Sequence, residues 1–156
     1  MDGIEQLTAI KCGVKWPNDI ILNNRKVGGI LIETKKNVDN FYIVIGMGIN
    51  VNENIDDMYH DIKETGTSLK IVNNTPIQRE QLLASILNIL EKRFLSPWEN
   101  NIKDWEKKCV HFNKNISFKY NNNIIEGIFK GLNKKGGAKL NSMGNQLEFS
   151  TGIMAL

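Results

Sequence analysis

Apolar residues in the first half of the chain occur as short runs separated by turn residues. Ile4, Leu7 and Ile10 recur at helical spacing and predict a short helix over Asp2–Lys11. The runs that follow are rich in aliphatic and β-branched residues, which is typical of strands. They are Val14–Trp16, Ile20–Leu22, Lys26–Glu33, Phe41–Ile45 and Ile49–Asn52. So little chain separates them that a largely antiparallel or mixed sheet is expected, rather than repeated βαβ units.

A turn and an apolar run specify this predicted sheet further. Asn23 and Asn24 lie between two strand-like runs, and asparagine tolerates the left-handed backbone that a tight hairpin turn requires. Phe41–Ile45 is a near-continuous apolar run, which predicts a buried central strand. Gly46 and Gly48 interrupt the apolar run before it resumes.

Two helices with recognisable start signals follow the sheet. Thr75 and Pro76 offer a cap and a first-turn proline before an apolar stripe from Leu82 to Phe94. A capping box with proline at the first helical position is predicted at Ser96–Glu99, where it opens the second helix.

The last part of the chain changes to short strands with turn residues at regular intervals. The predicted strands are Ile116–Tyr120, Ile124–Leu132, Ala138–Asn141 and Gln146–Phe149. This spacing is typical of a small β-barrel. The predicted fold class is therefore α+β, with a partial mixed β-sheet and flanking helices in residues 1–110 and a small C-terminal β-barrel in residues 111–156.

Composition and cysteine content restrict the class of protein. The 156 residues are 41% hydrophobic and 24% charged, which suits a folded chain with a packed core. No apolar run reaches the roughly 18–20 residues of a membrane span, and the start lacks the order of a signal peptide. Cys12 and Cys109 stand far apart without a Cys/His cluster, which excludes a disulfide framework and a structural zinc site. A cytoplasmic protein without a membrane partner is expected.

The net charge of +3 is unevenly distributed. Residues 1–102 hold 11 Lys and Arg against 13 Asp and Glu, whereas residues 103–156 hold 9 against 4. A basic terminal region could bind nucleic acid or an acidic protein. Its lysines are spread over several predicted elements instead of forming one basic run, so no DNA or RNA binding is expected.

The segment Lys15–Asp19 carries the most informative chemistry. Lys15 stands between Val14 and Trp16, just before a proline turn. Strand alternation allows Lys15 to point into solvent while its two neighbours face inward. The alternative is an ammonium aimed into a cleft, where it acts as a compact point charge on an anionic or carbonyl group. The segment alone leaves both interpretations open.

Four sequence blocks resemble those of biotin protein ligases, in the family's order and approximate spacing. They are Lys15–Asp19, Lys26–Glu33, Val44–Asn52 and Thr67–Leu69. The two predicted helices and the small terminal barrel also match the family's layout, so the resemblance covers essentially the whole chain. Lipoate ligases, the sister family, are a weaker match because they lack the Trp-Pro-Asn-Asp context.

The resemblance implies ATP-dependent activation of biotin as biotinyl-5'-adenylate and transfer of biotin to a lysine of a carboxylase's biotin carrier domain. ATP, Mg2+ and biotin would be substrates, and no resident metal is implied. Lys15 matches the family's catalytic lysine, whose ammonium would stabilise charge on the α-phosphate and then on the acyl oxygen. Contacts with biotin or the adenylate are implied for Lys15, Gly28, Gly29, Gly46, Gly48 and Asn50. The turn that places Lys15 would be held by Trp16, Pro17, Asn18 and Asp19.

Several of these positions also have ordinary structural explanations. Gly28 and Gly29 could mark a bulge or a crowded packing position instead of a surface for biotin's fused rings. Gly46 and Gly48 form an isolated Gly-x-Gly, without the third glycine and following helix of a dinucleotide-binding motif. Asn50 could contact adenine or stabilise a turn.

The resemblance leaves out the first half of the family's catalytic domain. The glycine- and arginine-rich loop that wraps biotin and the phosphates has no counterpart here, where the arginines are Arg25, Arg79 and Arg93. The DNA-binding domain of some members is also missing. A fragment, a truncated product or one half of a split ligase is therefore expected, with a complementary N-terminal chain as its partner. The alternative is a non-catalytic remnant that binds the adenylate weakly.

The remaining candidates are interpreted structurally. Cys12 is expected to be a small buried residue, and His60 and His111 lack partners at catalytic or metal-binding spacing. An acidic run is expected to be a solvated face rather than a magnesium site; it comprises Asp56, Asp57, Asp61 and Glu64. Trp98 and Trp105 lie on one face of the second predicted helix and are interpreted as core anchors between the two domains.

Overall fold

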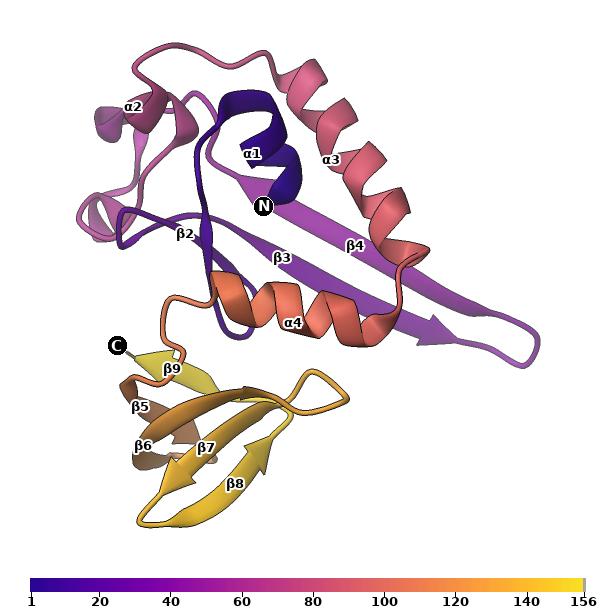
Figure 1. Ribbon diagram of the computed structural model, residues 1–156. Helices are drawn as coiled ribbons and strands as arrows, with labels where there is room; N and C mark the ends of the chain where they lie inside the picture. The colour runs from indigo at the N-terminus through magenta and orange to yellow at the C-terminus, as the bar shows by residue number, and fades with distance from the viewer. Residues whose placement is uncertain (156) are drawn as a thin grey trace. The chain divides into compact units, whose positions relative to one another are not determined.

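The contacts within the chain group its elements into two units. The computed structural model describes residues 1–155, and Figure 1 shows its helices and strands. The first unit comprises Met1–Cys12 and Asn18–Leu87, and the second comprises Gly13–Pro17 and Asn88–Leu156. The short segment that carries Lys15 therefore belongs with the C-terminal residues. The predicted functional domains 1–110 and 111–156 follow a different division and stay a prediction.

An antiparallel sheet forms the centre of the first unit. Its strands β2 (Asp19–Leu22), β3 (Arg25–Lys36) and β4 (Phe41–Ile49) are paired in that order. The predicted hairpin turn between β2 and β3 is confirmed, since Asn23 and Asn24 have φ values of 50° and 60°. Asparagine adopts this left-handed backbone more readily than most residues. The α+β class is confirmed, with antiparallel strand pairs in this unit.

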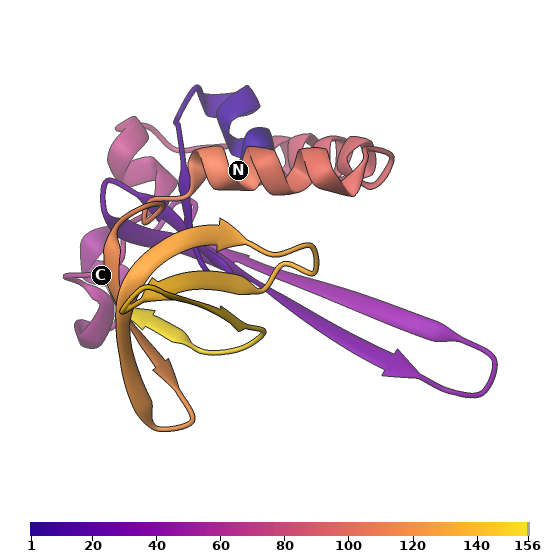
Figure 2. The same ribbon diagram turned by 60° about the horizontal axis from the view of Figure 1, so that its bottom comes forward.

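The far half of the β3–β4 hairpin is exposed. Leu31 and Phe41 are each 61% exposed and Val44 is 62% exposed, and β4 ends the strand order of its sheet. The prediction of a buried central strand over Phe41–Ile45 is therefore wrong. An apolar run in the sequence predicts a strand, but it does not show whether another element packs against that strand. Figures 1 and 2 show the tip of this hairpin extending beyond the helices of its own unit.

The core of the first unit joins its strands to its helices. The helices are α1 (Asp2–Thr8), α2 (Leu69–Asn73) and the part of α3 (Arg79–Phe94) up to Leu87, with the short 3-10 turns η1 (Ile55–Asp57) and η2 (His60–Ile62) between β4 and α2. Buried residues from several of these elements form one cluster: Ile4, Cys12, Ile20, Leu22, Val27, Val51, Leu69, Ile77 and Leu82. Cys12 is thus buried, as predicted. No helix among the described residues is long and apolar enough to cross a membrane.

Long-range hydrogen bonds precede the start of α3. The Asn52 side chain donates to the carbonyl of Ile77 and accepts from its N–H, both at 2.9 Å. These hydrogen bonds connect the segment before α3 to the residues that follow β4. The helix begins at Arg79, so the start predicted at Thr75–Pro76 is wrong. The residues at the predicted helix start do not reveal a hydrogen bond to a residue 25 positions away.

The second unit contains a five-stranded antiparallel sheet. Four strands fall close to the predicted runs: β5 (Asn115–Tyr120), β6 (Asn123–Leu132), β7 (Ala138–Ser142) and β8 (Asn145–Phe149). A fifth strand, β9 (Ile153–Ala155), is missed by the hydrophobic pattern. The order β8-β7-β6-β5-β9 is open, so the strands of the described residues form a curled sheet in place of a closed barrel (Figure 2).

Helix α4 (Trp98–Lys108) precedes this sheet and begins without the predicted capping box. Pro97 occupies the N-cap, and the Ser96 hydroxyl bonds back to a carbonyl of the preceding helical turn at 2.9 Å. Trp105 packs against the core of the second unit. Trp98 is 53% exposed, so its interpretation as a core anchor is wrong.

Candidate functional site

Three glycines leave one side of the first sheet bare. Gly29 on β3 is paired with Gly48 on β4, and Gly46 lies two positions before Gly48. Directly opposed residues of an antiparallel pair face the same side, as do residues two apart on one strand. A Cβ at Gly48 would meet nothing within 4 Å, and one at Gly46 would meet only the Leu31 carbonyl oxygen, at 3.7 Å. These three residues, called here the glycine face, expose a flat strip of backbone.

The opposite side of the same strands is covered by α3. Met47 and Ile49 alternate with the glycines of β4 and therefore point the other way. With Leu82 and Ile86 of α3 they line a cavity of about 560 Å³. The helix occupies one side of the sheet, and the glycine face lies on the other.

Gly28 and Gly29 are adjacent in the chain but have different surroundings. A Cβ at Gly28 would clash with the carbonyl oxygen of Gly48, because β3 and β4 approach closely there. A Cβ at Gly29 would find its nearest neighbour, the Asn18 carbonyl oxygen, at an ordinary 3.5 Å. Next to Gly28, the pairing of β2 with β3 also shifts register between Ile20 and Ile21. Gly28 thus has a packing role, whereas Gly29 belongs to the open side; a contact of either with biotin stays a prediction.

The turn before β2 is fixed to β3 by hydrogen bonds. The Asn18 side-chain amide donates to the Ile30 carbonyl at 2.8 Å, and the Ile30 N–H donates to the Asn18 carbonyl at 3.0 Å. Asp19 lies 2.5 Å from the ammonium of Lys26, on the neighbouring strand. Pro17 is joined to Trp16 by a cis peptide bond. Asn18 and Asp19 therefore hold a defined turn at one end of the glycine face.

Asn50 follows β4 and holds the end of that strand in place. Its side-chain amide donates to the Thr67 carbonyl at 3.0 Å, and its backbone N–H donates to the Val27 carbonyl at 2.8 Å. The next residue, Ser68, is fully buried; its hydroxyl accepts from the Ile71 N–H and caps α2. These bonds favour the turn-stabilising interpretation of Asn50, and its contact with adenine stays a prediction.

Lys15 ends β1 (Gly13–Lys15) and lies between two inward-facing residues. Val14 and Trp16 are 6% and 4% exposed, whereas Lys15 is half-buried, which fits alternating sides. The Val110 N–H donates to the Val14 carbonyl at 2.9 Å, and the Trp16 indole N–H donates to the Gly136 carbonyl at 3.1 Å. Residues of the C-terminal part thus fix the backbone on both sides of Lys15.

Comparisons with known proteins show which families and structures this chain is similar to. Residues 1–50 match the Biotin/lipoate A/B protein ligase family. The bifunctional ligase/repressor BirA of Bacillus subtilis is 30% identical over 141 residues, and that of Escherichia coli is 33% identical over 148 residues. The alignments cover 87% and 90% of this chain but 43% and 45% of those proteins. The chain therefore spans less than half the length of the curated relatives it matches.

Solved structures of biotin protein ligases are also similar to this chain. A biotin protein ligase from Aquifex aeolicus superposes with a TM-score of 0.82 at 25% identity, over 99% of this chain and 68% of that chain. This chain is related to the biotin protein ligases and matches their C-terminal part. A structure of the Aquifex ligase in complex with biotin and ATP superposes with a TM-score of 0.79 at 26% identity, over 99% of this chain and 65% of that one.

The acidic run of this ligase relative is a surface segment. Asn54 donates to the Asp57 carboxylate from its backbone and its side chain, both at 2.8 Å, and these hydrogen bonds lower the pKa of Asp57. Asp56 lies 3.4 Å from the ammonium of Lys63. Within residues 1–155, no three His, Cys, Asp or Glu side chains gather as a metal-binding group.

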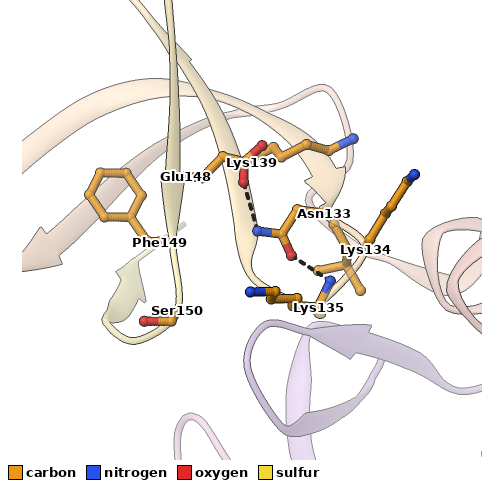
Figure 3. A pocket seen from close by; sticks show the side chains of 8 residues that line it. Asn133, Lys134, Lys135, Lys139, Glu148, Phe149 and Ser150 are labelled. Atoms are coloured by element: carbon orange, nitrogen blue, oxygen red, sulfur yellow. Dashed lines mark hydrogen bonds between the residues drawn. The ribbon is translucent and has the colours of Figure 1, made fainter.

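A lysine-rich pocket in the second unit is missed by the sequence pattern. Figure 3 shows the turn between β6 and β7, where the Asn133 amide oxygen accepts from the Lys135 N–H at 2.9 Å. The same oxygen also accepts from the Gly137 N–H at 2.9 Å. The Asn133 amide nitrogen donates to Glu148 at 2.8 Å. The pocket has a volume of about 710 Å³ and includes three lysines, Lys134, Lys135 and Lys139. Three lysines against one glutamate give it a net positive charge.

Proposed function

We propose that this chain forms part of an ATP-dependent biotin protein ligase, which joins biotin to a lysine of a biotin carrier domain of a carboxylase. The observation that supports the proposal is the glycine face in a chain related to that family. Side-chain-free backbone lets a flat ring system approach closely, as the fused rings of biotin or an adenine base require. Gly29, Gly46 and Gly48 are proposed to provide this surface.

Lys15 is proposed to supply the positive charge for both chemical steps. In the first step the biotin carboxylate attacks the α-phosphorus of ATP and pyrophosphate leaves, so negative charge builds on the α-phosphate oxygens. In the second step the carrier lysine attacks the acyl carbonyl of biotinyl-5'-adenylate and AMP leaves, so charge builds on the acyl oxygen. A fixed ammonium near these atoms lowers both barriers. Magnesium enters this scheme as the MgATP substrate.

A complementary polypeptide is proposed to complete the site. Arg79 is paired with Glu53 at 3.3 Å and Arg93 with Asp104 at 2.6 Å, so two of the chain's three arginines are engaged in ion pairs. The exposed apolar strand β4 offers an edge to which another strand can pair. We propose that the partner carries the phosphate-binding loop of the family. The alternative is a non-catalytic chain that binds the adenylate weakly or only with such a partner.

The proposal is tested by biotin transfer with and without the complement. The purified chain is incubated with ATP, magnesium, biotin and an apo carrier domain, and transfer is detected on a streptavidin blot. We expect no labelling by the chain alone, and labelling after addition of the N-terminal part of a related ligase. Labelling by the chain alone would remove the need for a complement, and no labelling in either mixture would contradict the activity.

A variant pair ties the activity to the glycine face. A Cβ at Gly48 would meet nothing within 4 Å, so we expect the fold to accept Gly48→Val while the surface for the ring is lost. Val44→Ile adds one methylene to a residue that already carries a side chain on the same side of β4, and it leaves the three glycines unchanged. We expect the first change to abolish labelling in the reconstituted mixture and the second to leave it unchanged.

A further inference from the structure

A buried histidine in the second unit lacks a hydrogen-bond partner. His111 is 0% exposed, and among the described residues neither of its ring nitrogens has a partner. Its ring centroid lies 4.3 Å from that of Phe129 and 6.2 Å from that of Trp105, both in edge-on geometry. An unsatisfied buried polar group costs about 1–3 kcal/mol, which a phenylalanine packed between the same rings would avoid. Packing alone therefore does not explain an imidazole at this position.

Backbone pairing places His111 near the strand that carries Lys15. Val14 and Cys109 form a parallel bridge, and the Val110 N–H bonds to the Val14 carbonyl. The bridge is isolated, and both segments turn shortly after it. Lys15 follows Val14 by one position and His111 follows Cys109 by two, so both residues lie within two positions of the same bridge.

The electrostatics agree with this placement. Burial, followed by the positive charges of Lys15 and Lys114, lowers the pKa of His111 to about 4. The two lysines are the charged groups that act on the ring, while Trp105 and Phe129 pack against it. At neutral pH the imidazole is uncharged, and one of its nitrogens keeps a lone pair that can accept a hydrogen bond.

We propose that His111 is a positioning residue for Lys15, offering a buried acceptor to the lysine ammonium during catalysis. The inference rests on the proposed function, in which Lys15 is the catalytic group. A lysine side chain loses about 2 kcal/mol of rotamer entropy when it is fixed. An ammonium has three donors, so one can bind the His111 nitrogen while the others bind substrate oxygens. The bond requires the Lys15 side chain to turn from its position in this structure, where the imidazole nitrogens are unpaired.

The first test measures the relation between the two residues without any activity. The imidazole of His111 is titrated by NMR in the intact chain, with exposed His60 as the internal reference. Lys15→Met is compared with Lys114→Met, which removes one charge by the same substitution. We expect both changes to raise the pKa of His111, and Lys15→Met to raise it more. A shift with Lys15→Met that is absent, or no larger than that with Lys114→Met, would overturn the inference.

The second test measures positioning in the enzyme reconstituted with its complement. His111→Phe keeps an aromatic ring and removes both nitrogens, so we expect kcat for adenylate formation to fall by roughly 10- to 100-fold, because misplacement of a catalytic group by about 1 Å can cost about 10²-fold. KM for biotin and the melting temperature should not fall. His111→Gln, which restores an acceptor, should recover part of kcat. Full kcat with His111→Phe would refute the positioning role. A fall in kcat that is fully explained by a lower melting temperature of the variant would refute it as well.

If the parent enzyme makes no adenylate, the proposed function fails, and the titration still decides whether Lys15 lies beside the imidazole.

Discussion

The indole N–H of Trp16 donates a hydrogen bond to the carbonyl oxygen of Gly136, 3.1 Å away and 120 positions later in the chain. The same turn is held at a second point, where the Trp98 indole donates to the Lys134 carbonyl at 2.7 Å. Trp16 directly follows Lys15, so the position of the proposed catalytic lysine depends on the turn between β6 and β7. The C-terminal sheet is thus part of the scaffold of Lys15.

Trp16→Phe should destabilise the chain more than Trp98→Phe. Both changes remove an indole N–H that bonds to the same turn, but Trp16 is 4% exposed and Trp98 is 53% exposed. Loss of buried volume together with a hydrogen bond should cost about 2 kcal/mol at Trp16, against about 1 kcal/mol or less at Trp98. Urea unfolding followed by circular dichroism measures both. Equal losses would show that the Trp16 contact contributes little.

Gly28→Ala should destabilise the first unit, whereas Gly48→Ala should not. A methyl group at Gly28 meets the Gly48 carbonyl, and overpacking of this kind costs about 1–3 kcal/mol. A methyl group at Gly48 meets nothing within 4 Å, and replacing a strand glycine recovers up to about 1 kcal/mol of backbone entropy. Thermal unfolding of the two variants gives the comparison. A stable Gly28→Ala chain would mean that β3 and β4 can separate locally at little cost.

Lys15→Ala should affect the chemistry far more than the stability. In the reconstituted enzyme we expect adenylate formation to slow by about 10²–10³-fold, the usual effect of removing one group that stabilises developing charge. The free energy of unfolding should change by less than about 1 kcal/mol, because Lys15 is only half-buried. Lys15→Arg should restore only part of the rate, since a planar guanidinium is not an equivalent point charge. Pyrophosphate release provides the measurement, and parental rates with Lys15→Ala would end the catalytic assignment.

Stability should fall between pH 6.5 and pH 4 because of His111. Burial and nearby lysines lower its pKa in the folded chain from 6.5 to about 4. As the pH drops below 6.5, the unfolded chain takes up a proton that the folded chain does not, so the free energy of unfolding decreases by up to about 3 kcal/mol. The decrease levels off below about pH 4, where both states are protonated.

Urea unfolding at several pH values, with His111→Phe as the comparison, isolates this contribution. Asp57 and Asp104 also have lowered pKa values, from hydrogen bonds with Asn54 and with Arg93 respectively, but their contributions are lost nearer pH 4 and below. The variant should show a flatter profile from pH 6.5 to 4.5. Identical slopes for parent and variant would contradict the assigned pKa shift.

Local chemistry made part of this fold predictable. Asn23 and Asn24 identified a turn because asparagine adopts positive φ values, and the C-terminal strands were recognisable from the turns between them. The helix start at Thr75 failed because Asn52 binds Ile77 from a distant part of the chain. The exposure of β4 could not be foreseen, since its apolar run is the same whether or not another element covers it.

The candidate site could also be predicted only in part from the sequence. Lys15 and the glycine pairs were identifiable from their resemblance to a family, but only the strand register separates Gly28, which packs, from Gly29, which is open. No sequence pattern around His111 indicated a functional role. Its significance depends on burial and on a parallel bridge between Val14 and Cys109, which lie 95 positions apart in the numbering.

The isolated chain should self-associate through the β3–β4 hairpin. Phe41 and Ile43 are 61% and 56% exposed on a strand that ends its sheet, and Phe41–Ile45 contains neither charge nor proline. Such a strand presents unpaired backbone groups and apolar side chains to any second copy. The double change Phe41→Lys/Ile43→Lys places two charges on this strand and should restore a monomer. Val38→Lys is the matched control, because Val38 is 98% exposed but lies in the hairpin loop outside both strands.

Size-exclusion chromatography with light scattering separates the outcomes. The parent chain and Val38→Lys should give masses above 17.7 kDa that rise with concentration, and the double variant should stay near 17.7 kDa. Addition of the N-terminal part of a related ligase should also suppress self-association, because a paired edge is no longer available to a second copy. A parent chain that remains a compact monomer at high concentration would show that the hairpin is protected without a partner, and β4 would then lose its proposed role as the docking edge for a complementary chain.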